Sequence, residues 1–258
     1  MKYEYLSETV TIKTISENAR EGVFEIEGLY TGYGTTVGNS LRRVLLSSLP
    51  GAAITQVKIN GVSHEFTAIP GVVEDMVEIM LSLKRIRFRI HTAEPQVLTL
   101  KAKGEGIITA AQIKTNSQVD VITPEARIAT LSDKSSELDM ELTVEKGLGY
   151  VPAESRKTEK LSIGTIALDA IFTPVVKVNF SVENMRIEDR TDYNRLRLLI
   201  ETDESITPSQ ALRKSARILQ DHFGKIGEIE ATESKPVVIT EVEETKKEKR
   251  KTTRKKKE

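Results

Sequence analysis

The stretch GYGTTVGNSLRRVLLSSL, residues 32–49, decides how the rest of the chain is organised. Its glycines lead into a predicted helix from Val37, in which apolar residues recur at steps of three and four, the spacing of one helical face. Pro50 and Gly51 end this helix. Two adjacent arginines, Arg42 and Arg43, fall off the apolar stripe. The residues on the stripe are Val37, Leu41, Val44, Leu45, Ser48 and Leu49.

The spacing of the glycines does not match the common phosphate-binding loops. A dinucleotide fingerprint reads G-x-G-x-x-G and a P-loop ends in G-K-[ST], whereas this stretch reads G-x-G-x-x-x-G without a lysine. An enzyme that uses a nucleotide at these glycines is therefore the least favoured functional hypothesis. The favoured explanation is a tight strand-to-helix turn, where glycine supplies a positive φ or a close backbone contact.

The composition is that of a globular protein with an acidic body and a basic tail. The 258 residues are 38% hydrophobic and 29% charged. The net charge of zero conceals a net charge of +7 in residues 246–258 and of −7 before them. The absence of cysteine excludes disulfides and thiolate metal sites and is compatible with a reducing cytoplasm. We expect neither a secretory signal nor a membrane-spanning segment.

Most of the remaining sequence has the alternation of β-strands. Residues 71–83 are an exception, because apolar positions on most sides predict a second, buried helix. The Asn60-Gly61 pair predicts a hairpin turn with a return strand at residues 62–66. Short β-like runs between residues 86 and 144 indicate a small antiparallel domain. Further strands are expected at residues 10–15, 21–29, 52–59, 163–170, 175–182, 185–189 and 195–202.

A third predicted helix has a clear start signal. Thr207 can cap it, Pro208 suits its first position, and Gln210 completes a capping box. Its apolar residues recur at steps of four and three over about two heptads, a seam too short to stand alone without a partner helix. Beyond Thr232 the composition predicts disorder. The seam residues are Leu212, Ala216, Leu219, Phe223 and Ile226.

No pattern of catalytic or metal-binding residues stands out, and we predict no catalytic residue, no cofactor and no metal site. Glu74, Asp75 and Glu78 could bind Mg²⁺, but a solvated helix face is the better interpretation. On spacing alone, Arg42 and Arg43 fit a solvated face better than an anchor for a protein partner. The basic tail fits a nucleic-acid contact and a solubilising segment about equally well.

Several blocks of the sequence closely resemble the α subunit of bacterial and plastid RNA polymerase. The first is GYGTTVGNSLRRVLLSSLPGAAITQVKINGVSHEF at residues 32–66. It is followed, in the family's order, by GVVEDMVEIMLSLK, GLGYVPA, FTPVVKVNFSVENMRIEDRTDYNRLRLLIET and ITPSQALRKSARIL. The blocks span nearly all of residues 3–226, and their number makes the resemblance specific.

The resemblance implies an α+β fold with a discontinuous dimerisation domain and an inserted second domain. The dimerisation domain, an antiparallel sheet with two helices, would comprise residues 1–50 and 175–230. The inserted domain, which is mainly β, would comprise residues 51–174. Residues 231–258 would form a disordered charged tail.

The resemblance also implies which residues meet other subunits. Two copies would dimerise through Tyr33, Val37, Val44, Leu45, Leu212, Ala216, Leu219, Phe223 and Ile226. The large β subunit would contact Gly38, Asn39, Arg42 and Arg43. The β′ subunit would contact Pro174, Val175, Lys177 and Arg190.

The function that the resemblance implies is assembly of a larger enzyme. The chain would homodimerise and scaffold β and β′ in a DNA-directed RNA polymerase, a nucleotidyltransferase that also contains ω and sigma. It would carry no catalytic residues itself and would act in the cytoplasm, at the nucleoid. We expect the family's small carboxy-terminal domain to be absent, which leaves the basic tail as the candidate for a non-specific DNA contact. The alternative is a free-standing nucleic-acid-binding protein that uses this tail.

Overall fold

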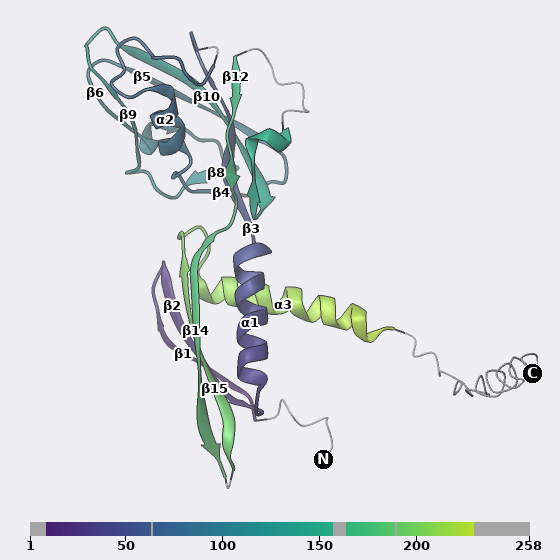
Figure 1. Ribbon diagram of the computed structural model, residues 1–258. Helices are drawn as coiled ribbons and strands as arrows, with labels where there is room; N and C mark the ends of the chain where they lie inside the picture. Colours follow the sequence, from purple (N-terminus) through teal and green to yellow (C-terminus); the bar gives the residue numbers. More distant parts are fainter. Residues whose placement is uncertain (1–8, 63, 157–163, 189, 230–258) are drawn as a thin grey trace, which may run out of the picture. The chain divides into compact units, whose positions relative to one another are not determined.

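A computed structural model describes residues 9–62, 64–156, 164–188 and 190–229 (Figure 1). In this part of the chain, mostly antiparallel strands are accompanied by three α-helices, which confirms the predicted α+β class. The helices are α1 (Tyr33–Ser47), α2 (Met76–Leu83) and α3 (Pro208–Gly227). The strands are β1 (Thr11–Glu17), β2 (Glu21–Leu29), β3 (Pro50–Ile59), β4 (Phe88–Ile90), β5 (Gln96–Lys103), β6 (Gly106–Thr109), β7 (Ile113–Lys114), β8 (Val119–Val121), β9 (Arg127–Leu131), β10 (Glu137–Leu148), β11 (Tyr150–Val151), β12 (Thr165–Ala167), β13 (Ala170–Ile171), β14 (Val175–Ile187) and β15 (Arg190–Thr202).

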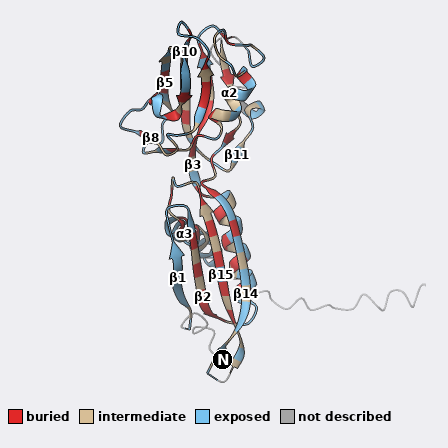
Figure 2. Ribbon diagram, turned by 90° about the vertical axis from the view of Figure 1, so that its left-hand side faces the viewer, coloured by how far each residue is buried: buried red, intermediate tan, exposed pale blue. Residues whose placement is uncertain are grey.

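A four-stranded antiparallel sheet joins segments from the beginning and the end of the described chain. Its order is β1-β2-β15-β14, and Phe24 of β2 lies opposite Leu198 of β15. Alternate residues of β2 and β15 are buried (Figure 2), because α1 and the start of α3 pack on one face of the sheet. The buried core residues are Phe24, Ile26, Leu29, Leu41, Leu45, Leu49, Val175, Val178, Leu196, Leu198, Ile200, Ile206 and Ala211.

The opposite face of this sheet is polar and carries ion pairs between strands. Glu27 accepts from Lys13 at 2.6 Å and from Arg195 at 3.0 Å, so one carboxylate connects β2 with both neighbouring strands. The hydrogen bond from Lys13 outweighs partial burial and, together with Arg195, lowers the pKa of Glu27. A sheet with one apolar and one charged face needs cover on one side only, which α1 and α3 supply.

A second core lies around a seven-stranded sheet built from the middle of the sequence. Its strand order is β7-β5-β10-β3-β4-β8, with β12 also paired to β3. The helix α2 covers this core with Met76, Ile79 and Leu83, which are fully buried. All core residues of this cluster fall between residues 52 and 168, so the two cores draw on different parts of the sequence.

The structure corrects the predicted starts of two helices. The helix α1 begins at Tyr33 rather than Val37. The helix α2 begins at Met76 rather than near residue 71, because Asp75 caps it by accepting the backbone N–H of Glu78 at 2.8 Å. The prediction that this second helix is buried on most sides was also wrong. Val73, just before it, and Val77 and Leu81 within it are 66%, 37% and 52% exposed.

Two strand predictions are likewise corrected. The described residues around 62–66 form no strand: Val62 is buried in the second core, whereas Phe66 is 79% exposed. The separate runs predicted at residues 175–182, 185–189 and 195–202 form one long hairpin, β14–β15. None of the described helices has the length and hydropathy needed to cross a membrane. The predicted disordered tail lies outside the described residues.

Candidate functional site

The glycines of the opening stretch let α1 lie close against the sheet. Gly34 and Gly38 are buried on the sheet-facing side of the helix, one turn apart. A Cβ atom at Gly34 would lie 2.6 Å from Cγ1 of Val182, and one at Gly38 would lie 2.7 Å from Cδ2 of Phe180. Gly32, which precedes the helix, has a φ of +84°. Close packing and a positive φ therefore explain the glycines without a phosphate ligand.

This packing corrects the role predicted for Gly38. The resemblance implies that the β subunit contacts Gly38, but the residue lies inside α1 and faces the sheet. Together with Gly34, Leu41 and Leu45 it forms the buried stripe of the helix. Gly38 is thus buried within its own subunit.

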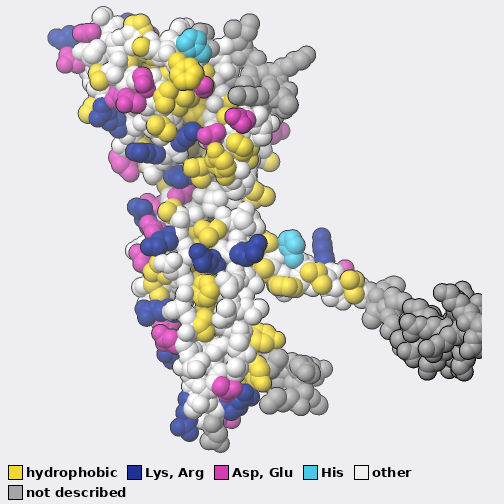
Figure 3. Space-filling view, viewed as in Figure 1, with side chains coloured by type: hydrophobic (Ala, Val, Ile, Leu, Met, Phe, Trp, Pro, Cys, Tyr) yellow, Lys and Arg dark blue, Asp and Glu magenta, His cyan; other side chains and the backbone are white. Residues whose placement is uncertain are grey.

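The side of α1 away from the sheet is polar and exposed. It carries Asn39 and Arg43, and Arg43 lies roughly 170° around the helix from the buried stripe at about 100° per residue. Arg42 is also exposed, but it lies on the flank of the helix, roughly 70° from the stripe. No side chain among the described residues pairs with either arginine. Basic side chains on α1 are visible in Figure 3. The structure thus presents both guanidinium groups to solvent on a rigid helix.

A third side of α1 carries the residues predicted at the dimer interface. Tyr33 is 47% exposed, and Val37 and Val44 are half-buried. Leu45 is different, because it is fully buried within the core of its own subunit. Its side chain supports α1 from inside and is not available to a second copy.

The other predicted dimer residues lie along α3. The predicted start of this helix is confirmed, since the Thr207 hydroxyl accepts the backbone N–H of Gln210 at 3.4 Å. Leu212 and Leu219 are half-buried against the core, and Ala216 is exposed. Phe223 and Ile226 are 61% and 63% exposed. A large apolar side chain exposed in each of two successive helical turns is typical of an interface.

The four residues predicted to meet β′ do not form one site. Pro174 and Val175 are buried, and only Lys177 of this group is exposed. Arg190 pairs with Ile187 at the far end of the hairpin. Because β14 has 13 residues, about 40 Å separates its two ends at 3.3 Å per residue. The structure thus splits this predicted set into two places.

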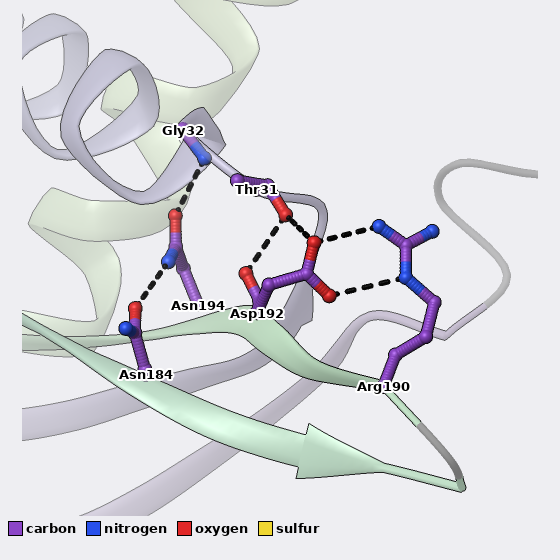
Figure 4. Close-up of polar contacts among 6 residues, drawn as sticks. All are labelled: Thr31, Gly32, Asn184, Arg190, Asp192 and Asn194. Carbon is purple, nitrogen blue, oxygen red and sulfur yellow. Dashed lines mark hydrogen bonds and ion pairs between the residues drawn. The ribbon is translucent and has the colours of Figure 1, made fainter.

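Arg190 takes part in a polar cluster that reaches the start of α1 (Figure 4). Its guanidinium donates to Asp192 at 2.7 and 3.1 Å and lies over the rings of Tyr30 and Tyr193 at 5.1 and 5.2 Å. Asp192 also accepts from the Thr31 hydroxyl at 2.6 Å. The Arg190 guanidinium and then the Thr31 hydroxyl hold the pKa of the Asp192 carboxyl well below its ordinary value.

Asn194 continues this cluster to the first turn of the helix. Its Oδ1 atom accepts the backbone N–H groups of Gly32 at 2.9 Å and of Gly34 at 3.3 Å. Its Nδ2 atom donates to Oδ1 of Asn184 at 3.3 Å. The sequence interpretation gave no role to Asp192 or Asn194. The sequence did contain one indication for Asn194. The alternation that buries Leu196 and Leu198 puts this polar residue on the same apolar face of the strand.

Two of the three acidic residues considered for Mg²⁺ have structural partners. Glu74 accepts the backbone N–H of Thr130 at 2.6 Å and also pairs with Arg127. Asp75 caps α2. Within the described ranges, no group of three or more His, Asp or Glu side chains is arranged to hold a metal ion.

Comparisons with known proteins agree with one another. Residues 57–173 match the family described as the RNA polymerase Rpb3/RpoA insert domain. The chain is 47% identical over 240 residues to the DNA-directed RNA polymerase subunit alpha of Alkaliphilus oremlandii, covering 93% of this chain and 75% of that protein. For the subunit of the same name from Symbiobacterium thermophilum, the identity is 49% over 209 residues, covering 81% and 66%. For that from Carboxydothermus hydrogenoformans it is 47% over 238 residues, covering 92% and 76%.

Proposed function

Because this chain belongs to the family of bacterial RNA polymerase α subunits, we propose that it is the assembly scaffold of a DNA-directed RNA polymerase. Two copies pair, and the pair binds the large β subunit and then β′. The complete enzyme is a nucleotidyltransferase, and the contribution of this chain is to bring the large subunits together. We also propose that it works in the cytoplasm.

The observation that carries this proposal is the exposed arginine face of α1. Arg42 and Arg43 lie on a helix that is fixed to a sheet, and no described side chain neutralises them. A guanidinium binds a carboxylate through two parallel hydrogen bonds, and arginine is enriched among the residues that dominate interface affinity. A carboxylate of the β subunit is the chemistry that this face fits, and Asn39 beside it can add a neutral hydrogen bond.

Pairing of two copies is supported by apolar side chains that their own chain leaves exposed. The proposed dimer surface comprises Tyr33, Val37 and Val44 of α1 and Leu212, Ala216, Leu219, Phe223 and Ile226 of α3. Leu45 no longer belongs to it, since it is buried in the subunit. A two-fold dimer presents every surface twice, so one copy can bind β while the other binds β′.

For the β′ contact, we propose the exposed Lys177 end of β14. Pro174 and Val175 would shape this end from within, because both are buried. The other end of the hairpin, with Arg190, is about 40 Å away by the rise of a strand. A single contact of modest size would not include both ends.

The division into domains belongs to the same proposal. The dimerisation domain would comprise residues 1–50 and 175–230, and the inserted domain residues 51–174. The two separate hydrophobic cores support this division, as does the family match at residues 57–173. The comparisons do not support the alternative of a free-standing nucleic-acid-binding protein, whose basic tail lies outside the described residues.

The test is capture of β by purified, tagged chain. We expect Arg43→Ala to leave the dimer intact and to weaken capture about ten-fold or more, as expected for a dominant interface arginine. Arg217→Ala is the matched control, because Arg217 is an exposed arginine on another helix of the same chain. Normal capture of β by Arg43→Ala would show that the assigned face is wrong.

A further inference from the structure

The first turn of α1 depends on a residue that is far away in the sequence. The first N–H groups of a helix lack partners within the helix and need a cap. The cap position of α1 is Gly32, which offers no side chain, and the helix has no side-chain cap of its own. The N–H groups of Gly32 and Gly34 donate instead to Asn194 of β15. The start of the helix is thus attached to the sheet by one amide group.

This amide is held in a single arrangement by its surroundings. Asn194 is only 6% exposed, and its Nδ2 atom donates to Asn184 of the neighbouring strand. Gly34 lies so close that a Cβ atom there would be 3.0 Å from the Cβ of Asn194. Because the amide cannot rotate freely in this space, its oxygen stays directed at the two N–H groups.

Arg190 belongs to the same cluster. Its guanidinium is already engaged by two hydrogen bonds to Asp192 and by the faces of Tyr30 and Tyr193. Asp192 in turn accepts from Thr31, the residue before Gly32. The hydrogen bonds therefore run from the end of the hairpin to the residues that open α1 (Figure 4).

We propose that Asn194, Asp192 and Arg190 are positioning residues that fix the first turn of α1 and so set the direction in which Arg43 is presented. We call these three residues the α1 clamp. Arg190 acts through Asp192 inside its own subunit and not as a direct contact to β′. The part of this inference that concerns Arg43 rests on the proposed function, whereas the part that concerns the helix start does not.

The far end of α1 is held in a comparable way. The Thr173 hydroxyl donates to the backbone carbonyl of Leu46 at 3.3 Å. An isolated helix of 15 residues is marginal in water, so tertiary contacts decide its position. With both ends attached, the central turns that carry Asn39, Arg42 and Arg43 cannot pivot on the sheet. Loss of the α1 clamp would free the first end only.

The first test measures amide hydrogen exchange in the intact dimer, which needs no partner. We expect Asn194→Ala to speed the exchange of a peptide covering residues 32–38 by about five-fold or more, the ratio typical of a lost helix cap. Asn194→Asp should restore slow exchange, because a carboxylate accepts both N–H groups and suits a helix start. The exposed amide of Asn184 can turn so that its Nδ2 atom, rather than its Oδ1 atom, faces the new carboxylate. A peptide covering residues 196–200 of β15 is the internal reference and should stay unchanged, which excludes global unfolding. Unchanged exchange at residues 32–38 in Asn194→Ala overturns the inference.

The second test asks what Arg190 does. We expect Arg190→Ala to speed exchange at residues 32–38 and to weaken capture of β, in the same direction as Asn194→Ala. The matched control is Asp139→Ala, which removes an exposed ion pair with Lys101 at 2.7 Å in the other sheet and should change neither readout. Normal exchange with impaired addition of β′ in Arg190→Ala would make Arg190 a direct contact and overturn its positioning role.

The two proposals fail in different ways. If the clamp variants speed exchange but capture β normally while Arg43→Ala does not, the link between the α1 clamp and the binding face is overturned and the scaffold proposal stands. If Arg43→Ala itself captures β normally, the proposal that the arginine face of α1 binds β is overturned. The exchange result then still decides whether the α1 clamp fixes the helix.

Discussion

Replacing Gly38 by alanine adds one methyl group at a point of very close approach between α1 and the sheet. The new Cβ would lie 2.7 and 2.9 Å from two ring carbons of Phe180 and 3.0 Å from Cδ1 of Leu196. Carbon atoms in contact are ordinarily 3.5–4.0 Å apart, so the helix or the ring must shift by about 1 Å. Leu196 is fully buried, and Phe180 is half-buried against the same core.

Two effects of opposite sign decide how Gly38→Ala changes the free energy of unfolding. Alanine is better than glycine inside a helix by about 1 kcal/mol, whereas forcing an extra carbon into a packed core costs about 1–3 kcal/mol. The overlap with two different side chains places Gly38→Ala at the upper end of that range. We therefore expect a net decrease of about 1–2 kcal/mol in the free energy of unfolding.

The chain offers a matched control for this substitution. Gly224 is also a helical glycine, but a Cβ there would meet nothing within 4 Å. Gly224→Ala should therefore raise the free energy of unfolding by up to about 1 kcal/mol. The assay is urea unfolding of wild type and both variants at one protein concentration, because the midpoint of a dimer depends on concentration.

One outcome would refute the reasoning. If Gly38→Ala is as stable as the wild type or more stable, the close approach between α1 and the sheet does not constrain the helix. If it is equally stable and captures less β, Gly38 touches the partner itself, as the resemblance first implied. The structure instead predicts a loss of stability, with capture of β impaired through the displaced helix.

Four further predictions concern other parts of the chain. Phe223→Glu should convert the dimer to a folded monomer, because the Phe223 side chain is 61% exposed in the single subunit. Sedimentation that shows an intact dimer would contradict the proposed place of α3 in the interface. Leu219→Glu should also lower the stability of the subunit, since Leu219 packs partly against the core, which thermal unfolding of the two variants can compare. The pKa of Asp192 is lower in the folded than in the unfolded chain, so its stabilising contribution is present above the ordinary aspartate pKa of about 3.9 and is lost as the pH falls toward the folded-state pKa. Asp192→Asn lacks this contribution and should therefore lose less stability than the wild type when the pH is lowered below about 4. Equal losses of the two proteins in urea unfolding would contradict this. Residues 246–258 carry a net charge of +7. Deleting them should leave the capture of β unchanged and weaken the salt-dependent retention of the assembled enzyme on DNA. Unchanged retention on DNA would show that the tail makes no DNA contact.

Sequence patterns located most elements because each pattern reports a local property. The alternation in residues 21–29 indicates a strand with one apolar face, and the capping box at Thr207 marks the start of α3. The same patterns misplaced the start of α2. Apolar residues at 72–73 extend its periodicity, but Asp75 competes by capping the helix at Met76.

Periodicity also says that a face is apolar without saying what covers it. Leu45 and Val44 are neighbours on the predicted stripe, yet Leu45 is fully buried in its own core and Val44 is only half-buried. On the second helix, Val77 belongs to the same apolar pattern as Ile79 but is 37% exposed. The difference depends on which neighbouring element reaches each side of the helix, and no local pattern contains that information.

By itself, the sequence determined the glycine-to-arginine helix and, through its resemblance to a family, the α+β class and the membership of the RNA polymerase α subunits. Only the tertiary structure decided how the helix is held. Asn194 and Gly32 are separated by 162 positions, and they meet because β15 pairs with β2 beside the start of α1. The glycines are needed because Val182 and Phe180 of β14 occupy the space that side chains at Gly34 and Gly38 would fill. Pairing between distant strands thus fixed the orientation of a helix whose existence local spacing had already predicted.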